Sequence, residues 1–140
     1  MLSLEEVAKG RTIAEAQGMT AELGNAIARL AAGELEAGRL DTARAILEGL
    51  AVTNPRDPAA WTLLAQLLRR QGEVYGARLC AEAAIRLAPE ESEVRLARAE
   101  VLLLIPAEAG AARDELAALA RSAGGPARDR ARTLLAALGP

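Results

Sequence analysis

The sequence predicts an all-α domain, a right-handed stack of helical hairpins, and three observations support this fold class. Residues 24–57 and 58–91 align with each other without a gap, so that Gly38 matches Gly72. About half of the residues are apolar, yet the chain has no Phe, one Trp and one Tyr, so Ala and Leu, which favour helices, must fill the core. Signals for helix starts and ends also recur at matching places in the two copies.

The second repeat carries the clearest helix signals. Asp57 is an expected N-cap and Pro58 suits the first helical position, because aspartate accepts a free backbone amide there and proline lacks one. Gly72 ends this helix, and Pro89 ends a second helix that begins at about Val74. Apolar residues recur at helical spacing and predict one packed hairpin. They are Trp61, Leu64, Ala65 and Leu68 on the first helix, and Ala77, Ala81, Ala84 and Ile85 on the second.

The remaining segments complete the stack on the same plan. A third, degenerate repeat is predicted over residues 92–125, with Pro106 where glycine would close the turn. Its second helix matches the other repeats best when one residue is inserted before it. Residues 126–138 predict a capping helix with an apolar stripe. Residues 1–19 predict an N-terminal arm of two short helical pieces. The apolar positions are Ile27, Leu30, Ala31, Leu40, Ala43, Leu47 and Leu50 in the first repeat, Ala112, Leu116 and Leu119 in the third, and Leu2, Leu4, Val7 and Ile13 in the arm.

Composition argues against several function classes. The net charge of −2 and the scattered arginines predict no nucleic-acid partner. The longest apolar run, Val101–Ile105, is too short to span a membrane, and Glu5 and Glu6 argue against a signal peptide, so we expect a cytoplasmic protein. The chain has no His, and its lone Cys80 is best interpreted as a small buried side chain. We therefore expect no catalytic residues, no metal site and no cofactor.

The period of the repeat resembles that of the tetratricopeptide repeat (TPR), whose consensus is matched at Trp61, Leu64, Ala65, Leu68, Ala77, Ala81 and Pro89. The first repeat departs from that consensus at Glu34, where an aromatic is usual. The order of parts resembles the class II chaperones of type III secretion, which bind translocator proteins before export. The segments that carry this resemblance are Thr12–Met19, Glu36–Ala43, Ala99–Leu103 and Arg130–Leu138.

This resemblance implies a concave groove that holds an extended segment of a membrane-active translocator. It also implies a weak homodimer through the N-terminal arm, although the arm could instead pack on its own first hairpin. The alternative function is a general TPR adaptor or scaffold that joins subunits of a larger assembly. Both functions are binding functions, so the expected partner is a protein or peptide and the chain is not expected to be an enzyme.

The helical register predicts which residues line the groove. On the first helix of each hairpin, the face beside the packing face repeats at i, i+4 and i+7 and forms an apolar trough with a polar middle. The alternative is that these are ordinary solvent-facing positions. The Arg69–Arg70 pair and the acidic run from Glu90 to Glu93 are interpreted as surface charge. The predicted groove residues are Ala28, Ala32, Leu35, Thr62, Gln66, Arg69, Leu96, Glu100 and Leu103.

Overall fold

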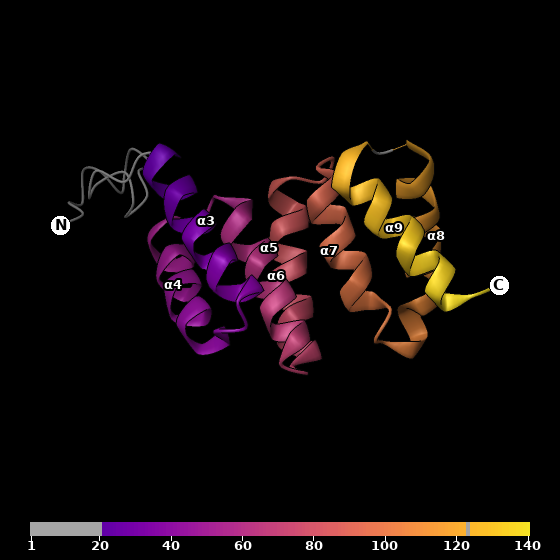
Figure 1. Ribbon diagram of the computed structural model, residues 1–140, viewed down its shortest axis with the longest axis horizontal. Coiled ribbons are helices and arrows are strands. Elements are labelled where there is room, and N and C mark those ends of the chain that lie inside the picture. Colours follow the sequence, from indigo (N-terminus) through magenta and orange to yellow (C-terminus); the bar gives the residue numbers. More distant parts are fainter. Residues whose placement is uncertain (1–20, 123) are drawn as a thin grey trace.

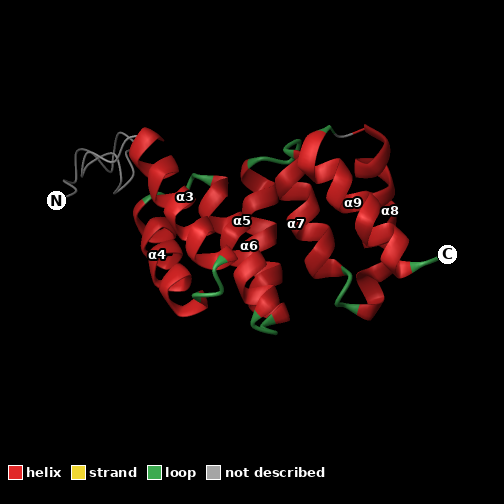
Figure 2. Ribbon diagram, viewed as in Figure 1, coloured by secondary structure: helices red, strands yellow, loops and turns green. Residues whose placement is uncertain are grey.

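The computed structural model describes residues 21–122 and 124–140, and these residues form α-helices, one short 3-10 helix and turns, with no strand among them (Figures 1 and 2). This confirms the all-α fold class; the predicted arm lies outside the described residues. The hairpins follow one another along the long axis of the molecule, with α3 and α4 at one end and α8 and α9 at the other (Figure 1). Their bounds are α3 Ala21–Glu36, α4 Leu40–Thr53, α5 Pro58–Arg70, α6 Val74–Leu87, α7 Ser92–Leu102, η1 Pro106–Glu108, α8 Ala109–Ser122 and α9 Gly125–Leu138.

Glycines close the turns of the first two hairpins. Gly38 and Gly72 have φ angles of 81° and 80°, in the left-handed region that residues with a Cβ rarely adopt. The amides that follow reach back over the helix end: Arg39 donates to the Glu34 carbonyl at 2.9 Å, and Glu73 donates to the Leu68 carbonyl at 2.9 Å. This is the hydrogen-bond pattern of a Schellman motif. The matched glycines therefore produce matched turns.

The start of α5 has the predicted N-cap. The Asp57 carboxylate accepts a hydrogen bond from the Ala59 amide at 2.9 Å, and Pro58 occupies the first helical turn. Trp61 is half-buried, and its indole nitrogen donates to the Pro55 carbonyl at 2.8 Å. The tryptophan therefore joins α5 to the loop that precedes it.

The third hairpin contains the predicted extra residue. In the second hairpin, α5 starts at Pro58 and α6 at Val74. In the third, α7 starts at Ser92 and α8 at Ala109. The distance along the chain between the two helix starts is therefore one residue longer in the third hairpin than in the second. The turn of this hairpin has η1, which begins at Pro106, in place of a left-handed glycine. With this insertion, the expected inner positions of α8 are fully buried. They are Ala112, Leu116 and Leu119.

Small side chains fill the places where helices cross. Helix axes that approach to about 8–10 Å leave little room at the contact. One core cluster spans α3 to α6 and receives Val101 from α7. A second cluster joins α7, α8 and α9. Fully buried alanines occur in both, namely Ala31, Ala43, Ala60, Ala65 and Ala77 in the first and Ala131 in the second.

The helices form two layers. Each odd-numbered helix packs on the next one, α3 on α5, α5 on α7 and α7 on α9. Within the described part of the chain, the even-numbered helices α4, α6 and α8 make no contacts of similar extent with each other. We call the side formed by α3, α5, α7 and α9 the odd-helix face, and the side formed by α4, α6 and α8 the even-helix face. Neighbouring helices therefore pack more closely on the odd-helix face than on the even-helix face.

We predict that Ala77→Leu destabilises the fold by about 1–3 kcal/mol, because the added atoms overpack a site that is 0% exposed. The control is Ala45→Leu, which makes the same change at an exposed position of α4 and should change stability by no more than about 0.5 kcal/mol. Urea unfolding compares the two variants. Equal effects would mean that Ala77 is not at a helix crossing.

Candidate functional site

A cavity of about 380 Å³ opens on the odd-helix face, where α3, α5 and α7 lie side by side. One side chain comes from α3, near the start of the described chain. The others come from the first turns of α5 and from the start of α7. The lining residues are Asn25, Asp57, Pro58, Ala59, Thr62, Leu63, Gln66, Glu91, Glu93 and Val94.

Equivalent positions of successive repeats supply much of this lining. Asn25, Ala59 and Glu93 occupy the same position in the first, second and third repeats, and Asp57 and Glu91 likewise match each other. The cavity therefore follows the repeat geometry, because equivalent helix starts are brought together on one face. Only the side chains differ from repeat to repeat.

The cavity combines a short apolar surface with an acidic rim. Leu63 is half-buried and Val94 is buried. Three carboxylates, Asp57, Glu91 and Glu93, stand at the helix starts, and no basic residue is among the residues that line the cavity. Carboxylates are favourable near helix N-termini, and these three together give the opening of the cavity a negative electrostatic potential.

Two of the predicted groove residues, Thr62 and Gln66, line the cavity. Thr62 is buried and its hydroxyl donates to the Pro58 carbonyl at 2.8 Å, so this hydroxyl is already bonded within α5. Gln66 is half-buried. Leu35 and Leu96 are each 5% exposed and belong to the two core clusters. The expectation that these two leucines form an open apolar surface is therefore wrong.

The physical reason is that each first helix is covered on more than one side. α5 packs on α4, α6, α3 and α7, so positions beside its hairpin-packing face meet the next odd-numbered helix rather than solvent. Ala28 is buried in the same way, while Ala32 and Leu103 are half-buried, with Leu103 packed on the second core cluster. The contact of all nine predicted residues with a ligand stays a prediction.

Three charged residues, one each from α5, α7 and α9, interact on the odd-helix face outside the cavity. Glu100 of α7, 7% exposed, accepts a hydrogen bond from Arg130 Nε of α9 at 2.8 Å. Its other carboxylate oxygen lies 3.7 Å from Arg69 Nη2 of α5. The buried Nε of Arg69 finds no hydrogen-bond partner among the described residues. Arg69 and Glu100 are thus paired with each other, and Arg69 keeps a free donor.

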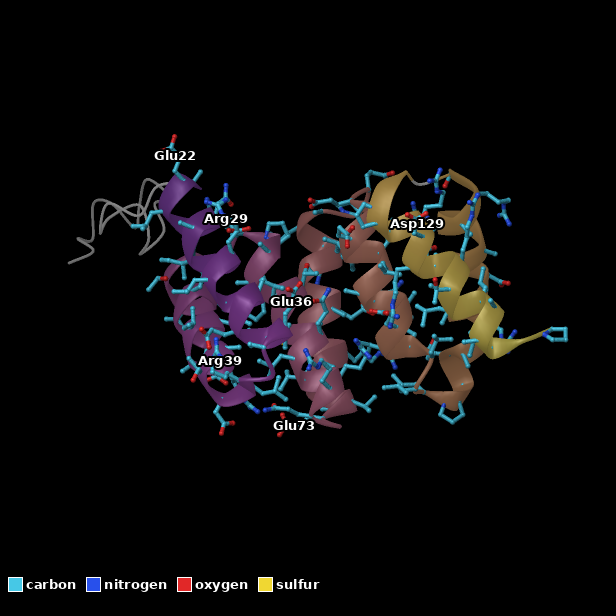
Figure 3. All side chains as sticks on the ribbon, in the orientation of Figure 1. Glu22, Arg29, Glu36, Arg39, Glu73 and Asp129 are labelled. Carbon is cyan, nitrogen blue, oxygen red and sulfur yellow. The ribbon has the colours of Figure 1, made fainter. Side chains whose placement is uncertain are left out.

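Other charged residues have structural partners. Arg70 Nη1 donates to the Leu35 carbonyl at 2.8 Å, near the C-terminal end of α3, where carbonyls lack helix partners. Glu34, which departs from the repeat consensus, is bonded by Arg39, and this hydrogen bond lowers the pKa of Glu34. Arg39 and Glu73 both precede second helices and lie along the lower edge of the molecule in Figure 3. These charges tie turns and helices together.

Cys80 lies on α6 and packs against the first core cluster, which agrees with its interpretation as a small hydrophobic residue. Burial disfavours the thiolate and raises the pKa of the Cys80 thiol. Across residues 21–122 and 124–140, no three His, Cys, Asp or Glu side chains come together as a metal site would require. None of the helices in this part of the chain has the length and apolar character needed to span a membrane.

Sequence reasoning missed several cavity residues, above all Asn25, Leu63, Glu91 and Glu93. The signal that could have found them is the repeat period itself, applied to the first turn of each repeat as well as to the middle of its first helix. The acidic run from Glu90 to Glu93 was interpreted as surface charge, and the structure brings Glu91 and Glu93 to the rim of the cavity.

We predict that Glu100→Ala lowers the free energy of unfolding by about 2–3 kcal/mol, because it leaves two guanidinium groups without their carboxylate. Because Arg69 and Arg130 are partly exposed, this loss of unfolding free energy is smaller than the loss expected for a fully buried ion pair. Glu48→Ala, which removes an exposed pair with Arg44, should cost at most about 1 kcal/mol. Urea unfolding measures both, and equal losses would contradict the role given to Glu100.

Comparisons with known proteins agree with this architecture. Residues 34–101 match the family model of the tetratricopeptide repeat. None of the curated proteins matches the chain. One solved structure with the same fold is the type III secretion translocator chaperone SycD of Yersinia enterocolitica, at 20% identity and a TM-score of 0.74, covering 91% of this chain and 98% of that one.

Two further structures share the fold. A type III secretion complex from Aeromonas hydrophila has a TM-score of 0.74 at 19% identity and covers 96% of this chain and 92% of that one. Yersinia enterocolitica SycD in complex with a peptide of the translocator YopD has a TM-score of 0.67 at 18% identity. The match covers 86% of this chain and 92% of that one. Residues 34–101 therefore match the tetratricopeptide repeat, and the chain as a whole resembles a type III secretion translocator chaperone in fold.

Proposed function

We propose that this chain is a protein-binding module that holds an extended segment of a type III secretion translocator on its odd-helix face. The observation that carries the proposal is the cavity shared by α3, α5 and α7, to which successive repeats contribute equivalent residues. A site built in this way runs across the helices, so it suits a ligand that is itself extended.

The likeness in fold to SycD supports this choice of client. One of the similar structures holds SycD together with a peptide of the translocator YopD. The likeness extends over most of both chains. We infer for this chain a client of the same class, a translocator, and a role as its chaperone.

The chemistry of the cavity defines what the bound segment should look like. Pro58, Ala59 and Leu63 are half-buried and offer an apolar surface for one or two apolar anchors, which would carry most of the binding energy. The side-chain amide of Gln66 is a donor that suits a backbone carbonyl of the client. The rim carboxylates favour lysine or arginine beside the apolar anchors.

The same likeness supports a cytoplasmic location and a role without catalysis. On the resemblance to the chaperone family, we also infer a weak homodimer through the N-terminal arm. The arm lies outside the described residues, and the proposal rests on that resemblance alone.

The alternative is a general TPR adaptor that joins several proteins. Large apolar side chains exposed on more than one element favour it, since an adaptor needs several contact surfaces. They include Leu30 on α3, Val52 on α4 and Tyr75 on α6. Identification of the bound proteins separates an adaptor from a chaperone.

We predict that the tagged full chain, used as bait in a lysate of its own organism, retains one membrane-active protein with long amphipathic segments. Asn25→Trp should abolish this retention, because Asn25 is exposed and lines the cavity, which a bulky indole would fill. Thr42→Trp introduces the same side chain at an exposed position of α4 and should retain the client. Mass spectrometry identifies the bound proteins.

Thermal melts of both tryptophan variants establish that the fold is kept. Several folded partners retained equally by all three proteins would favour the adaptor. Retention of a translocator by Asn25→Trp at the level of the original chain would place its binding site away from the cavity.

A further inference from the structure

The rim of the candidate cavity carries two carboxylates that the described residues leave unpaired. Asp57 uses its carboxylate as the N-cap of α5. Glu91 and Glu93 are both exposed, and among residues 21–122 and 124–140 neither side chain has a hydrogen-bond or ion-pair partner. They stand beside the half-buried apolar side chains of Pro58 and Leu63. Two free carboxylates at one opening favour a partner that has positive charges next to apolar groups.

A second hollow of the molecule offers no such charge. It lies on the even-helix face, has a volume of about 560 Å³ and is lined mostly by α6. Its two charged side chains already have partners within the chain. Arg78 bonds Glu108 at 3.0 Å, and Glu82 bonds Arg98 at 2.8 Å. A basic segment is therefore attracted to the acidic rim of the cavity and not to this hollow.

The N-terminal arm contains a segment with the complementary pattern. Residues 1–20 lie outside the described part of the chain, and the sequence there has Val7, Lys9, Arg11 and Ile13 at every second position. Side chains of an extended segment point alternately to opposite sides, so these four share one side when the segment is extended. That side has two basic groups between two apolar groups. The three residues in between are an alanine, a glycine and a threonine, which are small.

An extended conformation is accessible to this segment. The sequence predicts two short helical pieces in the arm, on either side of Gly10. Isolated helices shorter than about 12–15 residues are marginal in water, so little stability is lost when such a piece is extended. Residues 7–13 therefore match the cavity in charge, in apolar content and in the extended shape that suits a site running across the helices.

The point at which the described chain begins allows this segment to reach the cavity. The described part of α3 begins at Ala21, four residues before Asn25, so the chain enters α3 about 6 Å along its axis from a residue that lines the cavity. The eight residue steps from Ile13 to Ala21 span up to about 26–29 Å when extended. Adjacent helices lie about 8–10 Å apart, so this length is enough to cross from α3 over α5 to α7.

We propose that residues 7–13 of the N-terminal arm occupy the cavity on the odd-helix face when no client is bound. Lys9 and Arg11 pair with the free carboxylates of the rim, and Val7 and Ile13 pack on the apolar surface. Because the segment is tethered to α3, its local concentration at the cavity is high and does not depend on the protein concentration. A client must therefore displace it. This competition rests on the proposed function, since it requires the client to bind in the same cavity.

Residues 1–6 take no part in this contact. It is therefore compatible with a homodimer through the start of the arm.

Paramagnetic relaxation in the full chain, without any client, tests whether the segment docks. A spin label is attached at Ala8→Cys in a Cys80→Ser background, and the amide signals of the ¹⁵N-labelled chain are measured. The tether alone brings the label near α3, so the informative amides are those of α7. The Val94 amide should lose intensity, whereas the amide of Leu79, beside the second hollow, should keep its intensity. Thermal melts check that each variant is folded.

Charge reversal separates docking from tethering. Lys9→Glu combined with Arg11→Glu should restore the Val94 signal, because the segment then meets like charges at the rim. Adding Glu91→Lys and Glu93→Lys to that variant reverses both sides of the contact, so the loss of signal should return. A mixture of spin-labelled chain without ¹⁵N and ¹⁵N-labelled chain without a spin label reports contacts between copies. Its Val94 signal should keep its intensity.

The affinity for the client segment identified by affinity capture measures the consequence. Lys9→Glu combined with Arg11→Glu should lower the Kd of this segment by about three- to tenfold, because the cavity is then free for a larger fraction of the time. Arg121→Glu combined with Arg132→Glu makes the same change in net charge at exposed positions of α8 and α9 and should leave the Kd unchanged. Calorimetry measures both.

Three results without client would overturn the proposal and leave the proposed function standing. They are a Val94 signal that the label does not weaken, a loss of signal that survives the reversal at Lys9 and Arg11, and a loss of signal in the mixture, which would place the arm in the cavity of a second copy. A docked arm whose reversal leaves the Kd of the client segment unchanged would overturn the competition, and with it the placement of the client in this cavity.

Discussion

Close approach of helices through alanine is the constraint on which the rest of the structure depends. Fully buried alanines lie in both core clusters, and fully buried leucines such as Leu47 and Leu67 lie beside them in the first. With almost no aromatic side chains, the core gains its density from short distances between helices rather than from large residues. The odd-numbered helices touch one another under this constraint, and the even-numbered helices spread.

The two hollows of the molecule follow from this arrangement. On the odd-helix face, equivalent helix starts come together and leave the cavity bordered by Asn25, Ala59 and Glu93. On the even-helix face, the spread of the helices leaves the hollow beside Tyr75. The first is lined by polar groups and carboxylates as well as apolar atoms, and the second is an apolar centre flanked by ion pairs. The two hollows therefore differ in the chemistry of their linings.

Arginine side chains join helices of different hairpins and the end of the chain. Arg70 connects α5 to the end of α3, and Arg130 connects α9 to α7 through Glu100. Arg113 of α8 donates to the Gly139 carbonyl at 3.0 Å, just beyond the end of α9. These contacts link elements distant in sequence, and their planar donors give them defined geometry.

Local features of the fold were predictable from sequence because they depend on a few neighbouring residues. Gly38 and Gly72 close turns, and Asp57 with Pro58 starts α5. The insertion in the third repeat brings Leu116 into the core. The site was predicted less well, because its exposure depends on how adjacent repeats pack. Periodicity places Leu35 and Leu96 beside the packing face of their own hairpin, but it does not indicate that these positions are covered by further packing.

The central claim is that a client segment lies in the cavity on the odd-helix face. Nuclear magnetic resonance of the ¹⁵N-labelled chain, titrated with the client segment identified by affinity capture, tests it most directly. The account predicts the largest amide shift changes at Asn25, Gln66 and Glu93, with little change at Tyr75 and Leu79. Changes concentrated on α6, with none at the cavity, would contradict it.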